Sequence, residues 1–171
     1  MNVLNLFSSH KVVEINLSTG LRIGHMLSQH AYKDSTNKYV DNGNFFRLDK
    51  TNVDNVVLAD NVNAVGPYFL HYTEELFTTG LVDGLKYFTD EIVDGVCYPR
   101  CIALYVGDTF TTDNYTGTLS NASGYATVGK DGVLAVVDTA PTSVTGPLFQ
   151  AVKSTLPNGD PAVQFTVMSV D

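Results

Sequence analysis

Four histidines are the side chains in this sequence best suited to hold a metal or transfer a proton. They are His10, His25, His30 and His71. A zinc site needs at least three converging ligands, held in place by neighbouring groups. His25 and His30 could converge only if the chain bends between them, and no carboxylate has the spacing to complete a set. The sequence therefore favours structural or surface histidines, and we expect no metal and no other cofactor.

The densest carboxylates are two adjacent pairs, Glu74-Glu75 and Asp90-Glu91. A glycosidase needs two carboxyl groups about 5 to 10 Å apart on one site. Adjacent residues of a strand or helix point to different faces, so neither pair forms a ready acid–base dyad. We interpret these pairs as solvated surface, or as a charged seam that meets a basic partner.

Other reactive patterns are weak or missing. Asp108, Asp113 and Asp131 could contribute to a calcium site in loops, but the chain has no Asp-x-Asp-x-Asp-Gly ladder. It also has no Gly-x-Ser-x-Gly elbow and no glycine-rich phosphate loop. We therefore expect no catalytic residues, and a structural or binding protein rather than an enzyme.

Two cysteines, Cys97 and Cys101, are separated by three residues. A metal site would need two more ligands. In a strand the two side chains would lie about 13 Å apart, beyond the reach of a disulfide. We expect two reduced thiols that flank the start of a strand in a reducing compartment.

Length and composition predict a single domain. The chain has 171 residues, 44% of them hydrophobic and 16% charged, which is far from the composition of disordered proteins. The net charge of −8 disfavours direct contact with nucleic acid. No run approaches the roughly 20 apolar residues of a membrane span. Residues 1–7 lack the features of a signal peptide, so we expect folding in the cytoplasm of the cell that makes the protein.

Turn chemistry separates short apolar runs along most of the chain and predicts a mainly β fold. Asn-Gly and Asp-Gly supply the positive φ angles of tight hairpins. Predicted hairpins join 11–17 to 21–27, 38–40 to 45–48, 125–128 to 133–137, and 148–152 to 162–167. Further strands are expected at 56–59, at 101–106 and at 67–72, where Tyr68, Leu70 and Tyr72 lie opposite Phe69 and His71.

Between these strands, the apolar spacing of Leu81, Leu85, Phe88 and Ile92 suits a short helix, although Gly84 leaves a strand–turn–strand alternative open. We expect one domain over 1–171: a possible N-terminal arm (1–10), strands and hairpins (11–73), an insertion (74–95) and C-terminal barrel strands (96–171). Most tyrosines are expected to serve the core and strand pairing, and some to serve an interface. The tyrosines considered for these two roles are Tyr39, Tyr68, Tyr72, Tyr87, Tyr98, Tyr105, Tyr115 and Tyr125.

The succession of strands and turns in the second half resembles the head decoration (cement) proteins of tailed bacteriophages. The resemblance is carried by LYVGDTFTTDNY (104–115), GYATVG (124–129), DGVL (131–134), GPLF (146–149) and LPNGDPAV (156–163). GLRIGHML (20–27) is similar to their first barrel hairpin. The resemblance covers about half the chain, and the long segment 28–95 departs from shorter members of the family, so oligomeric state and capsid contacts do not carry over.

The resemblance implies a small antiparallel β-barrel or β-tulip on the outer capsid surface of a virion. It further implies binding to the major capsid protein, with no catalytic residues. Threefold or quasi-threefold sites on a capsid favour a homotrimer, so we also expect contacts with neighbouring copies. Residues 1–7 alternate apolar and polar, so the arm could add a strand to a neighbour; the alternative is pairing inside its own domain. Two other classes remain open: a receptor- or glycan-binding module of a phage tail or fibre, and a metal-dependent or carbohydrate-active enzyme.

Overall fold

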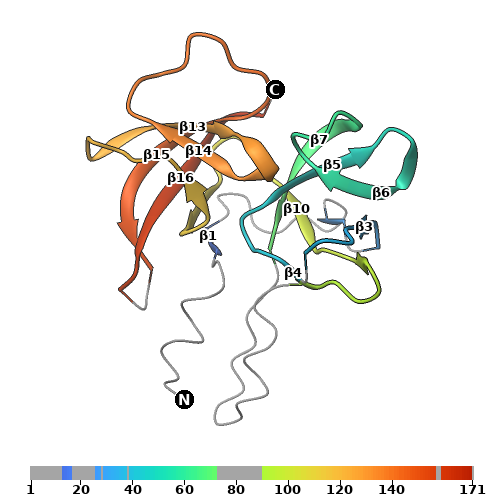
Figure 1. The fold of residues 1–171 in the computed structure, drawn as a ribbon. Helices are drawn as coiled ribbons and strands as arrows, with labels where there is room; N and C mark the ends of the chain where they lie inside the picture. Colours follow the sequence, from blue (N-terminus) through green and yellow to red (C-terminus); the bar gives the residue numbers. More distant parts are fainter. Residues whose placement is uncertain are drawn as a thin grey trace, which may run out of the picture.

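The chain is mainly β. The computed structural model describes residues 13–16, 26–27, 29–37, 39–72, 90–156 and 159–170. These residues form two curled, mixed sheets of seven strands each and a third sheet of two strands (Figure 1). One of the curled sheets is a half-barrel. The β-barrel-like domain predicted from the sequence is confirmed.

The first sheet collects the C-terminal strands and one N-terminal strand. Its order is β1-β11-β16-β15-β13-β14-β12, and every neighbouring pair is antiparallel except β12 and β14. Its strands are β1 (Val13–Asn16), β11 (Thr109–Thr112), β12 (Tyr115–Thr116), β13 (Ser123–Val128), β14 (Leu134–Val137), β15 (Leu148–Thr155) and β16 (Pro161–Ser169).

The second sheet has the order β2-β10-β7-β5-β6-β3-β9, and its parallel pair is β3 and β6. Strands β9 and β10 lie in this sheet, so the two sheets do not divide the chain at residue 96. Its strands are β2 (Met26–Leu27), β3 (Ala31–Lys33), β5 (Phe45–Asp49), β6 (Asn52–Leu58), β7 (Ala64–His71), β9 (Val96–Cys97) and β10 (Cys101–Ala103). The small sheet pairs β4 (Tyr39–Val40) with β8 (Asp90–Glu91).

Both C-terminal hairpins are confirmed. Strands β13 and β14 pair on either side of residues 129–132, where Asp131 has a φ of 57°. Strands β15 and β16 pair over their whole length, and Gly159 in their connection has a φ of 90°. In both places the turn residue takes the backbone conformation that its sequence predicted.

The hairpin between 38–40 and 45–48 was predicted wrongly, whereas most of the predicted hairpin between 11–17 and 21–27 lies outside the described residues. Strand β1 pairs with β11 in the first sheet, whereas β2 pairs with β10 in the second. Strand β4 pairs with β8, and β5 pairs with β6 and β7. Residues 41–44 do turn, since Gly43 has a φ of 90°, but the Gly43 N–H donates to the His71 carbonyl and the His71 N–H to that of Asn44. The turn therefore joins two different sheets instead of closing a hairpin.

Alternation along the second sheet produces two hydrophobic cores, because neighbouring strand residues point to opposite faces. Phe45 and Leu70 are buried in the core shared with the first sheet. Phe46 and Phe69 are buried in a second core on the other face. The prediction that Tyr68, Leu70 and Tyr72 point to one face of this segment and Phe69 to the other is confirmed.

Aromatic rings join the two sheets in the first core. Phe45 of the second sheet packs on Phe149 and Phe110 of the first, with ring centroids 5.6 and 6.2 Å apart. Phe165 lies 5.4 Å from Phe110 in the same cluster. The Phe45–Phe149 pair is edge-to-face, an arrangement that stabilises beyond the burial of area alone. The sheets are therefore packed as one unit.

The N-terminal arm at residues 1–10 lies outside the described residues. So do residues 73–89, which hold most of the predicted insertion and of the helix expected between Leu81 and Ile92. In the described part of the chain, no helix is long and apolar enough to cross a membrane.

Candidate functional site

The histidines that the structure describes are not gathered around a common point. His71 is fully buried; its Nδ1 lies 2.8 Å from the Asp41 carbonyl oxygen, and its ring packs edge-on against Phe46. His30 lies before β3, and its buried Nδ1 has no hydrogen-bond partner. His10 and His25 lie outside the described residues. Across the described ranges, no three His, Cys, Asp or Glu side chains are placed to hold a metal ion.

The aspartates considered for calcium serve the backbone of separate loops. Asp108 is buried, and its carboxylate accepts the N–H of Tyr105 at 2.9 Å. Asp131 is exposed at the tip of the β13–β14 hairpin and donates its own N–H to the carboxylate of Asp60. Glu74 and Glu75 lie outside the described residues, while the backbone of Asp90 and Glu91 forms β8.

The two cysteines are free thiols in the second core, and both are buried. Cys97 lies in β9 and Cys101 in β10, at opposite sides of the second sheet. Their role in the structure is packing.

A polar seam connects the two sheets at one end of the first core. Asn114 is buried, and its amide nitrogen donates to the Asn42 carbonyl and to the Asn44 side-chain oxygen, both at 2.8 Å. The Asn44 amide donates in turn to the Asp131 carbonyl at 2.9 Å. These bonds link the 41–44 turn to the first sheet and so fix the position of the two sheets relative to each other.

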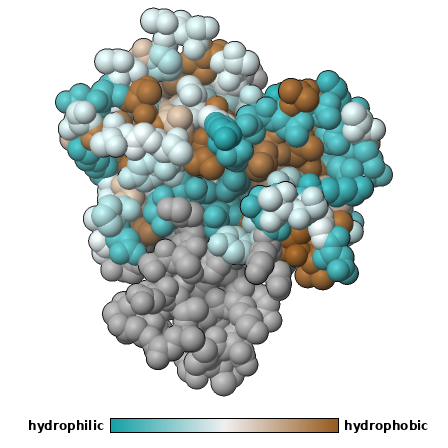
Figure 2. Space-filling model, in the orientation of Figure 1, coloured by the Kyte–Doolittle hydropathy of each residue, from teal (hydrophilic) through white to brown (hydrophobic). Residues whose placement is uncertain are grey.

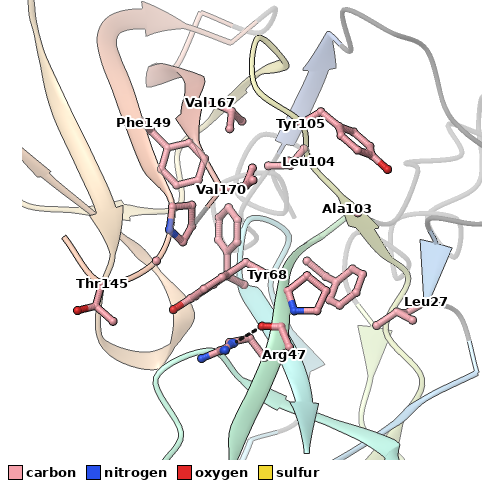
Figure 3. A pocket seen from close by; sticks show the side chains of 16 residues that line it. Leu27, Arg47, Tyr68, Ala103, Leu104, Tyr105, Thr145, Phe149, Val167 and Val170 are labelled. Carbon is pink, nitrogen blue, oxygen red and sulfur yellow. Dashed lines mark hydrogen bonds between the residues drawn. The ribbon is translucent and has the colours of Figure 1, made fainter.

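An apolar cleft opens where the sheets meet away from this seam, with a volume of about 650 Å³. Figure 2 shows hydrophobic surface between the two lobes of the molecule. Phe149 and Val167 of the first sheet form one wall, and Tyr68 of β7 and Leu104, directly after β10, form another (Figure 3). We call this site the apolar cleft.

Arg47 is the single charged side chain among the described residues that line the apolar cleft. Its Nε–H donates to the Gly66 carbonyl at 2.9 Å, and its guanidinium carbon lies 4.6 Å from the centre of the Tyr68 ring. Gly146 closes over Tyr68, because a Cβ at that position would lie 2.5 Å from the tyrosine hydroxyl. The cation at the edge of the cleft is therefore held in place on two sides.

A second, polar recess of about 590 Å³ lies beside β3 and β4. Its best-defined group is Asp34, whose carboxylate accepts hydrogen bonds from the Thr36 and Asn37 backbones and from the Tyr32 hydroxyl. Tyr39 is 42% exposed at its edge. We call this site the polar recess.

Hydrogen bonding sets the protonation states in the polar recess. Desolvation acts to raise the pKa of Asp34, but the hydrogen bonds from Thr36 and Asn37 outweigh it and lower the pKa. Desolvation, together with the neighbouring Asp34 charge, raises the pKa of Tyr32. At neutral pH the pair is therefore a carboxylate and a neutral phenol that donates to it.

Several large apolar side chains are exposed on the surface. Val62 is the most exposed at 88%, followed by Val53 at 64%. Tyr98, which the sequence placed among possible interface residues, is 58% exposed. Tyr68, Tyr72 and Tyr115 pack against the first core, as expected of most tyrosines, while Tyr87 lies outside the described residues.

The apolar cleft was not predicted from the sequence, because its walls come from strands far apart in the chain. One local signal existed: Arg47 interrupts the apolar run Phe45-Phe46-Arg47-Leu48 within a strand. A lone cation in such a run indicates a special environment, although it does not identify one.

Comparisons of the chain with protein-family models, with curated proteins and with solved structures gave no match.

Proposed function

We propose that this protein is a capsid decoration protein. In this role it binds the outer surface of an assembled bacteriophage head, contacts the major capsid protein and neighbouring copies of itself, and stabilises the contacts between capsid subunits. It does so as a binding framework and not as an enzyme.

The observation that carries the proposal is where the resembling segments lie in the fold. The runs 104–115, 124–129, 131–134, 146–149 and 156–163 are scattered over sixty residues of sequence, yet they supply parts of β11 to β16. These strands are neighbours in the first sheet. The segments on which the proposed resemblance rests therefore lie in one continuous structural unit, which supports the proposal.

The surface is consistent with a protein that docks on a larger assembly. Single apolar side chains such as Val62 and Val106 stand exposed, at 88% and 60%, and can gain burial in a complex. A net charge of −8 favours the solubility of free copies. Because binding to the assembled lattice but not to free subunits shifts the equilibrium by mass action, it stabilises the shell.

Self-association would strengthen this binding. A homotrimer places three modest contacts on a threefold or quasi-threefold site, so that avidity multiplies their effect. Strand β1 lies at an edge of the first sheet, directly after the arm at residues 1–10. Deletion of residues 1–9 tests the arm: unchanged binding by a folded, truncated protein would exclude a role for it.

Co-sedimentation tests the proposal. Purified protein is mixed with expanded heads, and separately with unassembled capsid subunits, and the pellet is quantified at saturation. We expect saturable, stoichiometric binding to heads alone, at a copy number set by the symmetry sites of the shell. Equal binding to free subunits, or no binding to heads, would refute the proposal.

The polar recess favours a second candidate, a glycan-binding module of a phage tail or fibre. Sugar recognition uses an exposed aromatic face beside fixed polar groups, and Tyr39 stands beside Asp34 and Asn37 in the recess. Binding of cell-surface glycans that is lost in Tyr39→Ala, together with failure to bind heads, would move the assignment to this class.

A further inference from the structure

We propose that the apolar cleft binds an amphipathic monocarboxylate, with the hydrocarbon part between the two sheets and the carboxylate on Arg47. This site is independent of the contacts with a capsid. It rests on the shape of the cleft, the nature of its walls and the position of its one charge.

The walls of the apolar cleft suit a hydrocarbon. A volume of about 650 Å³ lies within the range of small-molecule sites, which are mostly apolar with few polar groups. Phe149 and Val167 from the first sheet and Tyr68 and Leu104 from the side of the second line it, and all four lie in or against the first core (Figure 3). An alkyl chain or ring that enters the cleft removes apolar surface on both sheets from water.

The charge of the apolar cleft suits one anionic group. Arg47 uses its Nε–H on Gly66 and its cationic face on Tyr68, and within the described part of the chain it forms no ion pair. Its terminal nitrogens remain as donors, and a guanidinium binds a carboxylate through two parallel hydrogen bonds. The lining residues include no acidic side chain that would repel such a ligand.

The position of Arg47 gives the ligand an orientation. The guanidinium lies at the edge of the cleft beneath Tyr68, while the remaining wall residues surround the space beside it (Figure 3). A carboxylate on Arg47 therefore stays near solvent and its apolar tail reaches inward. An uncharged ligand of equal length would gain the same burial without the ion pair.

The absence of tryptophan from the sequence permits a clean assay. Thr145 is exposed at the edge of the cleft, so Thr145→Trp introduces a single fluorescent reporter. The reporter protein is titrated with decanoate and, separately, with 1-decanol. We expect saturable blue shifts with both ligands and about tenfold tighter binding of decanoate, the ratio for roughly 1.4 kcal/mol from a charge-assisted pair.

Three variants in the reporter background assign the effect. Arg47→Met should abolish the preference for decanoate and leave decanol binding unchanged, whereas Arg47→Lys should retain part of the preference. Val170→Phe should weaken both ligands by filling the cleft, since Val170 lines it and is 40% exposed. Lys130→Met is the matched control, since Lys130 is an exposed cation in the β13–β14 turn and should not matter. Thermal unfolding of each variant checks that it is folded.

Four outcomes would overturn the proposal: no blue shift with either ligand, equal affinities in the parent, a preference that survives in folded Arg47→Met, or undiminished binding in folded Val170→Phe. A short peptide of alternating leucine and aspartate serves as a competitor. If the peptide saturates the reporter where decanoate does not, the apolar cleft belongs to a protein partner instead.

Discussion

Asn114 links two sheets through a single buried amide. Its Nδ2 donates to the Asn42 carbonyl and to the Asn44 side chain, and its backbone N–H donates to the Thr112 hydroxyl. All three acceptors lie at the junction between the 41–44 turn and the first sheet. Buried polar groups that lose their partner pay the full cost of desolvation, so this residue has a large effect for its size.

Replacement of Asn114 tests the polar seam. Asn114→Ala should lower the free energy of unfolding by about 2 to 3 kcal/mol, because two buried acceptors lose their donor. Asn121→Ala is the control, since Asn121 is exposed and should change stability by less than about 0.5 kcal/mol. Denaturant unfolding followed by circular dichroism measures both. Equal effects of the two substitutions would contradict the role of the seam.

Asp34 gives the polar recess a pH dependence. Its folded-state pKa lies below the ordinary value of 3.8, so its stabilising effect is present above pH 3.8 and is lost as pH falls through the folded pKa. Asp34→Asn keeps acceptors for the Thr36 and Asn37 N–H groups but removes the titration. The melting temperatures of parent and variant should therefore differ most above pH 4 and converge at lower pH. A constant difference from pH 6 to pH 2.5 would contradict this assignment.

At the scale of elements, the β13–β14 hairpin contacts β5 through Gly132. Gly132 has a φ of +68°, and a Cβ there would lie 2.4 Å from the Phe45 carbonyl oxygen. Gly159, in the β15–β16 connection, has a φ of +90° with nothing within 4 Å of such a Cβ. The two glycines thus share a positive φ, which would strain a residue with a Cβ, but they differ in contact.

This difference predicts unequal costs of substitution. Gly159→Ala should lower the free energy of unfolding by about 1 kcal/mol, the cost of a left-handed backbone for a residue with a Cβ. Gly132→Ala should cost at least about 2 kcal/mol more, because the hairpin must move away from β5. Chemical denaturation measures both values. Similar losses at the two positions would show that the hairpin does not contact β5 as described.

Turn chemistry predicted where the chain reverses but not which strands then pair. Around 129–132 and 157–160 the flanking runs are long and alternate strongly, so the nearest partner is also the best one. At 41–44, β4 has two residues and cannot bury a face against β5. The longer β6 and β7 pair with β5 instead. A turn signal in the local sequence does not show which strands compete to pair with β5.

The candidate sites were harder to predict than the strands. The sequence predicted that Tyr68 and Leu70 point to one face of the strand and Phe69 to the other, because side chains alternate between the two faces of a strand with a period of two residues. The apolar cleft depends on Phe149 and Val167 approaching Tyr68 and Leu104, and these contacts arise only when two sheets pack. The polar seam likewise depends on a contact between residues 42 and 114.

At the scale of the whole molecule, the first core contains side chains from both sheets. Phe45, Leu70 and Ile102 come from the second sheet and pack with residues of the first. Neither sheet can therefore unfold without exposing the apolar surface of the other. We expect one cooperative thermal transition in calorimetry, with equal calorimetric and van't Hoff enthalpies. Two separable transitions would contradict the shared core.

The proposed role in the capsid requires more than binding. A decoration protein that bridges subunits must raise the resistance of the shell to disruption by heat, whereas a tail module or an incidental ligand of the head need not. The most direct measurement heats expanded heads with and without saturating protein and follows disruption by light scattering. We predict that disruption shifts to a higher temperature as the sites fill. Heads that bind the protein in full yet rupture at an unchanged temperature would contradict the account.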